Sequence, residues 1–201
     1  MKNSCDTVPT CIDAHMTRDD VGTRTYTING QIHRTDGPAI EYANGDRFWM
    51  INDKIHRTDG PALEYANGDR IWYHNNEIHR ADDLPAIERA NGTRKWFQNG
   101  VRCRAGGLPA IERVNGTREW YHNGIRGRPG GLPAVIYANG DQVWYHNGEL
   151  HRDDDLPAIE FANGDRKWYH NGKLHRDRGL PAIIHADGYC AGFIHGVRTP
   201  I

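Results

Sequence analysis

Histidines recur in two series along the chain, and they are the residues whose chemistry stands out first. Imidazole groups bind transition metals and transfer protons near neutral pH, so either role would require several of these side chains to converge. One series belongs to a repeated His-Arg segment, and the other directly precedes a repeated asparagine. The members are His33, His56, His79, His151 and His175 in the first series, and His74, His122, His146 and His170 in the second.

The spacing of the repeats argues against a metal site within either series. If each repeat contributes two strands, equivalent atoms in neighbouring repeats lie about 9.5 Å apart, because adjacent strands are ~4.8 Å apart. Two nitrogen ligands of one ion lie only about 3–4 Å apart, since a metal–nitrogen bond is about 2 Å long. We therefore predict no metal-binding residues. A bridge between the two series is left open, but no residue pattern supports it.

The segment His-Arg-x-Asp offers a structural explanation for the first series. Cys103 and Gly127 replace the histidine in two copies, and Gly106 and Gly130 replace the aspartate in the same copies. This joint loss indicates a hydrogen bond between the two side chains that fixes a loop, which we favour over a general-base dyad. The copy with His175 is the exception, because an arginine stands at its aspartate position. The predicted pairs are His33 with Asp36, His56 with Asp59, His79 with Asp82, and His151 with Asp154.

Other signatures of catalysis are absent from the sequence. It has no G-x-S-x-G segment, no phosphate-binding P-loop, no HExxH motif and no Cys–His arrangement at useful spacing. We therefore expect no catalytic residues, no cofactor and no enzymatic activity.

The segments that carry these residues are copies of one repeat. A glycine ends each copy at intervals of 23 or 24 residues: Gly22, Gly45, Gly68, Gly92, Gly116, Gly140, Gly164 and Gly188. Later copies insert a leucine before a Pro-Ala pair. This marks a loop, because an insertion within a strand would turn its side chains to the wrong face. We predict an N-terminal arm or cap over residues 1–21, seven repeats over residues 22–188, and a C-terminal half-repeat cap over residues 189–201.

Each copy also predicts a β-hairpin. Asn-Gly between two β-forming segments is a strong hairpin signal, since both residues of the two-residue turn adopt positive φ. An Asn44-Gly45 turn sets Ile40 opposite Trp49. In one later copy the same register sets two glutamates opposite each other, against the preference for oppositely charged pairs.

Alternation along these strands predicts which face is buried. The tryptophans and the aliphatic residues opposite them share one face, and acidic residues share the other. The remaining segment of each repeat must cover the apolar face, so we expect this arch to fold over it with its proline and leucine on the indole rings. We favour a core role for the tryptophans over a ligand-stacking platform. The predicted ladder is Trp49, Trp72, Trp96, Trp120, Trp144 and Trp168.

Composition narrows the classes of function. The formal net charge of −1 argues against a general attraction to nucleic acid or anionic lipid. The apolar fraction of 37% is low for a packed globule and suits a repeat array with many turns. No apolar run is long enough to span a bilayer, and no secretory signal is recognised. Four cysteines without a CxxC pair fit a reduced, intracellular protein, although pairing of Cys5 with Cys11 is left open.

The repeat resembles the MORN repeat. An aromatic residue shortly before Asn-Gly, a Gly-Pro-Ala turn and a second Asn-Gly recur with a period near 23 residues, from about Thr23 to Val197. The glycine that the family has in its second strand is absent, and the His-Arg-x-Asp segment is particular to this subtype. Repeats of this type are similar to those of large DNA viruses of amoebae, which implies a viral protein in the cytoplasm of an infected cell. The resemblance further implies an all-β, elongated, single-layer antiparallel sheet with one hairpin per repeat.

The same resemblance implies protein interaction or membrane-associated scaffolding. We expect a non-enzymatic scaffold that binds a protein partner, or a second copy of itself as a homodimer. A membrane-surface (phospholipid) adaptor is the alternative, although the sequence shows no amphipathic helix and no lipidation motif. An enzyme is the third and least favoured.

Candidate partner-binding residues lie in the fourth and fifth copies. We expect looser arches there, because glycines replace the predicted His–Asp pair. Neutral drift among tolerant repeats explains the same substitutions equally well. The residues are Cys103, Gly106, Gly127, Pro129 and Gly130.

Overall fold

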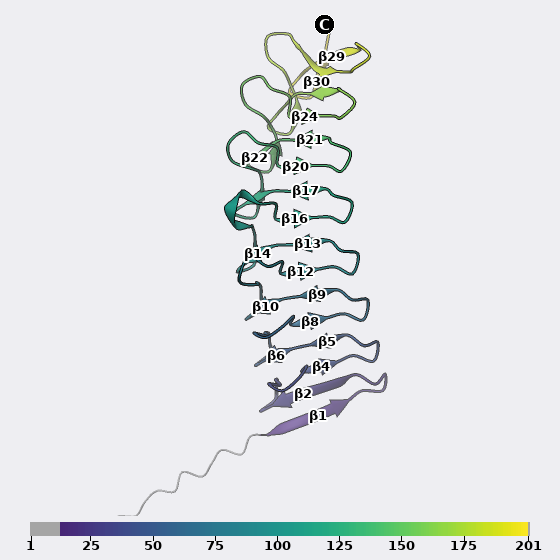
Figure 1. Cartoon of the computed structure of the whole chain (residues 1–201), viewed down its shortest axis with the longest axis vertical. Helices are drawn as coiled ribbons and strands as arrows, with labels where there is room; N and C mark the ends of the chain where they lie inside the picture. The colour runs from purple at the N-terminus through teal and green to yellow at the C-terminus, as the bar shows by residue number, and fades with distance from the viewer. Residues whose placement is uncertain (1–12, 201) are drawn as a thin grey trace, which may run out of the picture. The chain divides into compact units, whose positions relative to one another are not determined.

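The fold is all-β, an antiparallel sheet of tandem hairpins, as the sequence predicts (Figure 1). It is known from a computed structural model that describes residues 13–200. The chain divides into two compact units, Met1–Glu77 and Ile78–Ile201. Among the described residues no helix has both the length and the apolar character needed to cross a membrane.

In the first unit the main sheet follows the order β1–β2–β4–β5–β8–β9, and every neighbouring pair is antiparallel. Its strands are β1 (Ala14–Arg18), β2 (Arg24–Ile28), β4 (Ile40–Glu41), β5 (Arg47–Phe48), β8 (Leu63–Glu64) and β9 (Arg70–Ile71). Shorter strands lie beside it: β3 (Gln31–Ile32), β6 (Met50–Ile51), β7 (Lys54–Ile55), β10 (Tyr73–His74) and β11 (Glu77–Ile78), the last at the boundary of the unit.

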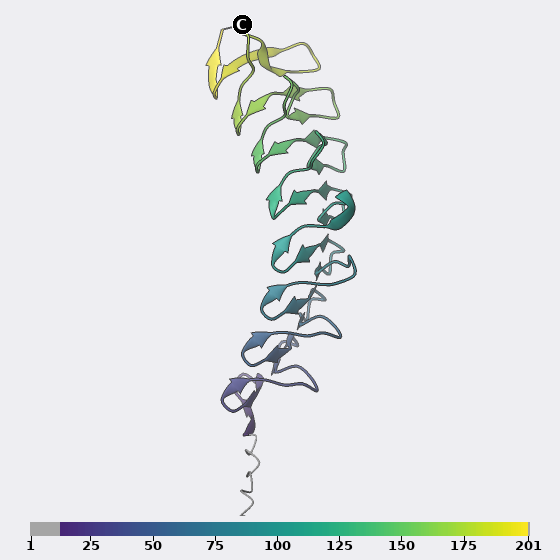
Figure 2. The same ribbon diagram turned by 90° about the vertical axis from the view of Figure 1, so that its left-hand side faces the viewer.

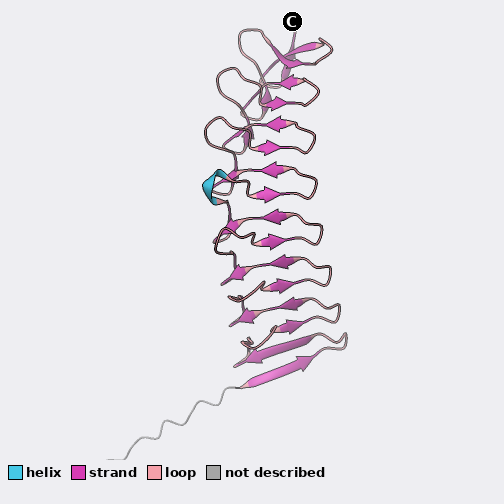
Figure 3. Cartoon of the chain, viewed as in Figure 1, coloured by secondary structure: helices cyan, strands magenta, loops and turns pink. Residues whose placement is uncertain are grey.

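The second unit repeats this plan (Figure 3). Its main sheet contains β12 (Ile87–Glu88), β13 (Arg94–Lys95), β16 (Ile111–Glu112), β17 (Arg118–Glu119), β20 (Val135–Ile136), β21 (Gln142–Val143), β24 (Ile159–Glu160), β25 (Arg166–Lys167), β28 (Pro181–Ile184), β29 (Cys190–Ile194) and β30 (Val197–Thr199). Separate short hairpins pair β14 (Phe97–Gln98) with β15 (Val101–Arg102), β18 (Tyr121–His122) with β19 (Ile125–Arg126), β22 (Tyr145–His146) with β23 (Glu149–Leu150), and β26 (Tyr169–His170) with β27 (Lys173–Leu174). One arch contains a single 3₁₀ turn, η1 (Ala105–Gly107).

The loop that contains Asn44 and Gly45 has three residues, whereas the sequence analysis predicts a two-residue turn. The N–H of Tyr42 donates to the carbonyl of Asp46, and the N–H of Gly45 donates back to the carbonyl of Tyr42, both at 2.9 Å. Gly45 has a φ of 95°, but Asn44 does not adopt positive φ. Its side chain instead accepts a hydrogen bond from the N–H of Asp46 at 3.0 Å. This is the three-residue hairpin loop in which only the glycine is left-handed.

The longer loop shifts the strand register by one residue. Ile40 lies opposite Phe48, so the predicted pairing of Ile40 with Trp49 is wrong. Because successive residues of a strand point to opposite faces, the tryptophans lie on the face opposite the aliphatic column. Trp49 lies beside Ala62, which directly precedes β8 and whose carbonyl accepts the Trp49 N–H at 2.8 Å.

The corrected register also removes the conflict between two glutamates. Glu112 lies opposite Arg118, a pair of opposite charge. Glu119 lies between Ile111 and Val135 on the aliphatic face. The Glu–Arg pairing recurs in other repeats, as between Glu41 and Arg47, Glu64 and Arg70, Glu88 and Arg94, and Glu160 and Arg166.

Each repeat contains a second hairpin, whereas the MORN resemblance implies one. Asn52 and Asp53 have φ values of 49° and 61°. They form the turn between β6 and β7, in which Met50 pairs with Ile55 and Ile51 pairs with Lys54. Both turn residues are left-handed, which defines the type I′ turn that Asn-Gly favours. The other turns of this kind are Asn29-Gly30, Asn75-Asn76, Asn99-Gly100, Asn123-Gly124, Asn147-Gly148, Asn171-Gly172 and His195-Gly196. The two Asn-Gly signals of the repeat therefore have different conformations.

The sheet buries side chains on both faces. On the tryptophan face one alanine per repeat is fully inaccessible: Ala39, Ala62, Ala86, Ala110, Ala134, Ala158 and Ala182. On the other face lie buried aliphatic residues, which include Leu63, Ile87, Ile111 and Val135. The second hairpin reaches this face, since the Tyr121 hydroxyl lies 3.1 Å from Glu119 Oε2. Figure 2 shows the short hairpins beside the main sheet within each unit.

The predicted N-terminal arm lies partly outside the described residues. Residues 1–12 are not described, and these include Cys5 and Cys11. The following segment forms β1, which pairs along its whole length with β2 from Ala14 opposite Ile28 to Arg18 opposite Arg24.

Candidate functional site

An arginine covers each tryptophan of the ladder for which the structure gives a ring contact. The guanidinium carbon lies 3.7 to 4.1 Å from the ring centre in the pairs Arg57–Trp49, Arg104–Trp96, Arg128–Trp120, Arg152–Trp144 and Arg176–Trp168. These arginines come from the His-Arg segment. The arch therefore folds over the tryptophans as predicted, but a cation lies on the indole where we expected proline and leucine. Trp96, Trp120, Trp144 and Trp168 are buried, and Trp49 and Trp72 are half-buried.

The indole N–H groups are also bound by the arches. Trp120 Nε1 donates to the carbonyl of Gly107, and Trp144 Nε1 donates to the carbonyl of Gly131, both at 2.8 Å. Trp96 and Trp168 donate in the same way to the carbonyls of Asp83 and Asp155. Because each accepting carbonyl belongs to the preceding arch, the tryptophan joins two repeats.

The stacked arginine is in turn fixed by acceptors. Arg152 Nη1 donates to Glu160 Oε1 at 2.8 Å and to the Pro157 carbonyl at 3.3 Å. Arg104 makes the same contact with Glu112 and adds a bond to Asp83 of the preceding arch at 3.0 Å. The ladder is thus a core of indole, guanidinium and carboxylate, and its polar groups are used within the fold.

The predicted His–Asp pairs are wrong where the structure describes both partners' contacts. Asp36 and Asp59 accept from the arginines of their own segments, Arg34 and Arg57, at 2.8 Å. These guanidinium groups lower the pKa of the Asp36 and Asp59 carboxyls below the usual range. His33 instead contacts Asn52 Oδ1 at 2.6 Å.

The histidines of the first series bind the turn of the next repeat. The backbone N–H of Asn75 donates to Nδ1 of His56 at 3.2 Å, and that of Asn171 donates to Nδ1 of His151 at 3.3 Å. His79 and His175 accept the same bond from the N–H groups of Asn99 and His195. His151 Nε2 contacts Asp153 at 3.0 Å, one residue before the predicted Asp154.

Backbone geometry explains the glycines at the predicted aspartate position. Asp154 has a φ of 63° and Asp82 a φ of 61°, and the glycines at the same place, Gly106 and Gly130, have 68° and 79°. Asp is one of the few residues besides Gly that adopts this conformation readily. The joint loss of His and Asp therefore does not reflect a bond between them. Arg178, with a φ of 61°, occupies the same position.

The arches of the candidate partner-binding residues share backbone features with the other arches of the second unit. The left-handed φ values of Gly106 and Gly130 match those of the aspartates, and the indole bonds to Gly107 and Gly131 match those of other repeats. Cys103 is a free thiol that lies 3.8 Å from Gln98 Oε1. With Gly127 and Pro129 these residues remain a predicted binding patch.

The two series of histidines lie next to each other and interleave. In the second unit the ring centres follow one another at 5.5 Å for His146–His151, 4.7 Å for His151–His170, 5.6 Å for His170–His175 and 4.4 Å for His175–His195. In the first unit His56 and His74 are 4.7 Å apart. The spacing argument concerns neighbours within one series, and it does not apply to these neighbours from different series.

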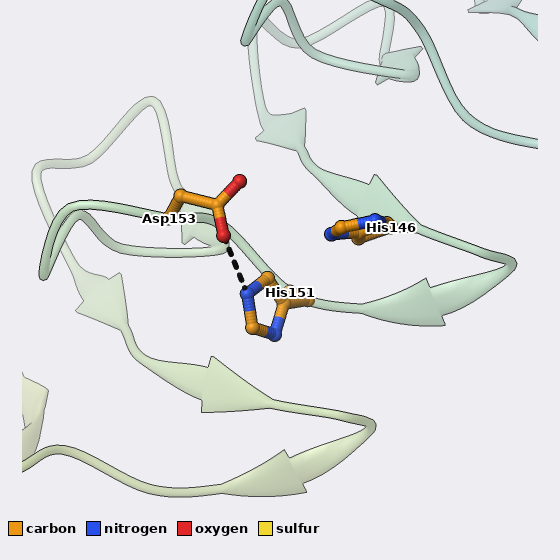
Figure 4. A group of neighbouring side chains, drawn as sticks. All are labelled: His146, His151 and Asp153. Atoms are coloured by element: carbon orange, nitrogen blue, oxygen red, sulfur yellow. Dashed lines mark hydrogen bonds and ion pairs between the residues drawn. The ribbon is translucent and has the colours of Figure 1, made fainter.

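One group in this histidine column has the donor set of a metal site. Ligand atoms of His146, His151 and Asp153 all lie within 4.8 Å of one another. Figure 4 shows His146 extending from its hairpin toward the His151 ring, which is hydrogen-bonded to Asp153. The three side chains line a cleft of 530 Å³ between two arches.

A row of leucines marks the arches of the second unit. Each is the residue inserted in the longer copies, and 39 to 48% of its surface is exposed: Leu84, Leu108, Leu132, Leu156 and Leu180. Four of them are presented by one turn, because the leucine N–H donates to the carbonyl three residues earlier in the arches of Leu84, Leu108, Leu156 and Leu180.

A buried glutamate forms a further ionic cluster that the sequence analysis does not anticipate. Glu119 is 4% exposed and accepts from Arg113 Nε at 2.9 Å and Arg126 Nη2 at 3.1 Å. Burial raises the pKa of the Glu119 carboxyl, but the two arginines and the Tyr121 hydroxyl outweigh it, so the pKa is lowered overall. The signal in the sequence was the misfit of Glu119 in the predicted register.

No protein-family model matches the chain, and no curated protein is similar to it in sequence.

Proposed function

We propose that the chain is a non-enzymatic scaffold. It binds another protein, or a second copy of itself, along the leucine row of the second unit. The observation that carries this proposal is the exposure of Leu84, Leu108, Leu132, Leu156 and Leu180 at 39 to 48% in successive arches. Monomeric proteins seldom expose large apolar side chains in an ordered row, and such rows are typical of interaction surfaces.

The environment of the row supports a protein partner. Since each repeat adds two strands, neighbouring leucines are about 9.5 Å apart along the sheet. Polar residues of the arches, such as Asp83, Asp154 and Arg128, separate them. An apolar stripe interrupted by charges fits an extended, folded partner that places one apolar side chain at each repeat.

The chemistry of the repeat supports a binding role over a catalytic one. The recurrent Trp, Arg and Glu side chains stack on or hydrogen-bond to one another, as in the Trp144–Arg152–Glu160 group. Most first-series histidines accept a backbone N–H with Nδ1. These groups are thereby committed to joining repeats. The exposed leucines, in contrast, are apolar side chains that the fold leaves accessible to a partner.

The resemblance to MORN repeats and the free thiols of Cys103 and Cys190 support the remaining parts of the proposal. In this view the protein acts inside a cell, as a viral scaffold would in an infected host. Self-association as a homodimer is one form that the interaction takes.

The test compares a row variant with a control that replaces an exposed apolar residue outside the row. The variant replaces three leucines of the row, Leu108→Ser, Leu132→Ser and Leu156→Ser. The control replaces Val114, which is 71% exposed and lies outside the row, with serine. Light scattering on a sizing column measures self-association, and affinity capture with the purified full chain measures binding to other proteins.

We expect the wild type and Val114→Ser to form the same complexes and the triple variant to lose them. Circular dichroism must show that the triple variant keeps its β structure, which is expected because the leucines are half-exposed. Complexes that the triple variant retains at wild-type affinity would contradict the proposal, as would a chain that remains monomeric and captures nothing.

A further inference from the structure

We propose that His146, His151 and Asp153 bind a divalent transition-metal ion of the zinc type. Their ligand atoms lie within 4.8 Å of one another, so small side-chain rotations bring them to a common ion. His146 and Asp153 are exposed, which leaves them free to rotate, whereas His151 is half-buried and anchors the group.

The donor set suits this class of ion. Two imidazoles and one carboxylate are the ligands of many zinc sites, and water from the surrounding cleft completes the tetrahedron. The cleft of 530 Å³ gives the ion access to solvent. Calcium and magnesium prefer sites made entirely of oxygen atoms, so they are excluded by the imidazoles.

The two arginines of the cleft are engaged by other groups and leave the Asp153 carboxylate to the ion. The guanidinium groups of Arg152 and Arg128 are stacked on Trp144 and Trp120, at 3.7 and 4.1 Å from the ring centres. Arg152 is also bound to Glu160. Among the residues that the structure describes, the His146 side chain makes no hydrogen bond or ion pair besides its ring contact with His151, so both ring nitrogens are available.

The sequence places this group in two copies only. An aspartate two residues after the first-series histidine occurs at Asp153 and Asp177, and other copies have Thr35, Thr58, Ala81, Ala105 and Pro129 at this position. His170, His175 and Asp177 occupy the equivalent positions in the next copy, with the two histidine ring centres 5.6 Å apart and His175 Nε2 at 3.1 Å from Asp177. Among the described residues, however, the ligand atoms lie within 4.8 Å of one another only in the group of His146, His151 and Asp153. Both aspartates of this kind lie at the same end of the second unit.

The protonation of His151 couples the site to the junction with the next repeat. A backbone N–H only donates, so Nδ1 of His151, which faces the N–H of Asn171 at 3.3 Å, carries no proton. The ring proton therefore lies on Nε2 and is shared with Asp153 at 3.0 Å. A metal ion that binds Nε2 displaces this proton, and the neutral ring then carries its proton on Nδ1. The bond from Asn171 must break.

This coupling gives a local readout that separates the site from other histidines. Titration of the full chain with ZnCl₂, followed by two-dimensional NMR, is expected to shift the amide resonance of Asn171. His146→Ala and Asp153→Asn are each expected to weaken this response at least about 10-fold, because each removes one of three ligands. MgCl₂ at the same concentration is expected to leave the resonance in place.

His122→Ala is the matched control. His122 occupies the same position as His146 on its hairpin, but the first-series position beside it is Gly127, so it lacks a partner imidazole. The control is expected to respond to zinc like the wild type. Substitution of cobalt for zinc should give the visible absorption of a tetrahedral site in the wild type and in His122→Ala. An Asn171 amide that zinc does not shift, or that shifts equally in His146→Ala, would overturn the proposal.

Discussion

The guanidinium carbon of Arg152 lies 3.7 Å from the centre of the Trp144 indole ring. The same guanidinium donates to Glu160 at 2.8 Å. One arginine thus covers the aromatic core and carries a charge-assisted hydrogen bond, and this arrangement recurs with the repeat.

Arg152→Met should reduce the free energy of unfolding by about 1–2 kcal/mol, since it removes a stacked cation from a desolvated indole. The free energy of unfolding of Arg152→Lys should lie between those of the wild type and Arg152→Met, because an ammonium group keeps the charge but lacks the plane that stacks on the ring. Lys173→Met, at an exposed residue of β27, serves as the control. Urea denaturation followed by tryptophan fluorescence measures the change. Equal stability of Arg152→Met and the control would show that the stack contributes nothing.

The indole N–H makes a separate contribution. Trp144→Phe keeps an aromatic ring under Arg152 but leaves the Gly131 carbonyl without its 2.8 Å donor. The expected loss is roughly 1–3 kcal/mol for an unsatisfied buried acceptor together with the reduced ring area. Among the residues that the structure describes, Trp49 Nε1 has no hydrogen-bond acceptor, so Trp49→Phe should destabilise the protein less. Calorimetry of the two variants gives the comparison, and an equal loss in both would refute a role for the N–H.

Much of this fold is predictable from the sequence, because the same pattern of residues recurs in seven copies. The period, the all-β class and the position of the arch follow from Asn-Gly pairs and from the inserted leucine. The register is not predictable from Asn-Gly alone. The Asn44 side chain accepts the N–H of Asp46 and thereby avoids positive φ, which lengthens the loop by one residue.

That single residue decides which side chains meet. In the observed register Glu112 faces Arg118. Pairing of opposite charges therefore indicates the correct register, whereas the Asn-Gly turn signal indicates the wrong one. The roles of His and Asp were also misassigned, because a joint substitution records shared backbone geometry as readily as a contact. Asp154 and Gly130 occupy one left-handed position, at φ 63° and 79°. The interleaving of the two histidine series could not be found without the second hairpin.

The three-residue loop makes a prediction about its glycine. Gly140 has a φ of 95°, and a Cβ there would lie 3.5 Å from the Cβ of Ala162. Gly140→Ala should destabilise the protein by roughly 1–2 kcal/mol, because an L-residue is strained in this conformation. Gly127 lacks positive φ, and its Cβ would meet only the Tyr145 carbonyl at 3.7 Å. Gly127→Ala should therefore be neutral or stabilise by up to about 1 kcal/mol. Thermal unfolding of both variants tests the assignment, which fails if Gly140→Ala is as stable as Gly127→Ala.

The buried carboxylate of Glu119 should make stability depend on pH. Its pKa is lowered in the folded protein because Arg113, Arg126 and Tyr121 together outweigh the effect of burial. The unfolded chain has a glutamate pKa of roughly 4.3. The stabilisation is therefore complete above that pH and is lost as the pH falls from there toward the folded pKa.

Glu119→Gln removes the charge and should be less stable than the wild type at neutral pH, with a difference that narrows as the pH falls below roughly 4. At low pH both proteins have a neutral side chain at position 119. Any difference in stability that remains there reflects how well each neutral side chain hydrogen-bonds to the two arginines. Glu149→Gln is the control, since Glu149 is exposed on β23. Urea midpoints across this pH range measure both variants. A difference between the wild type and Glu119→Gln that stays constant with pH would mean that the ionised carboxylate is not what stabilises this cluster.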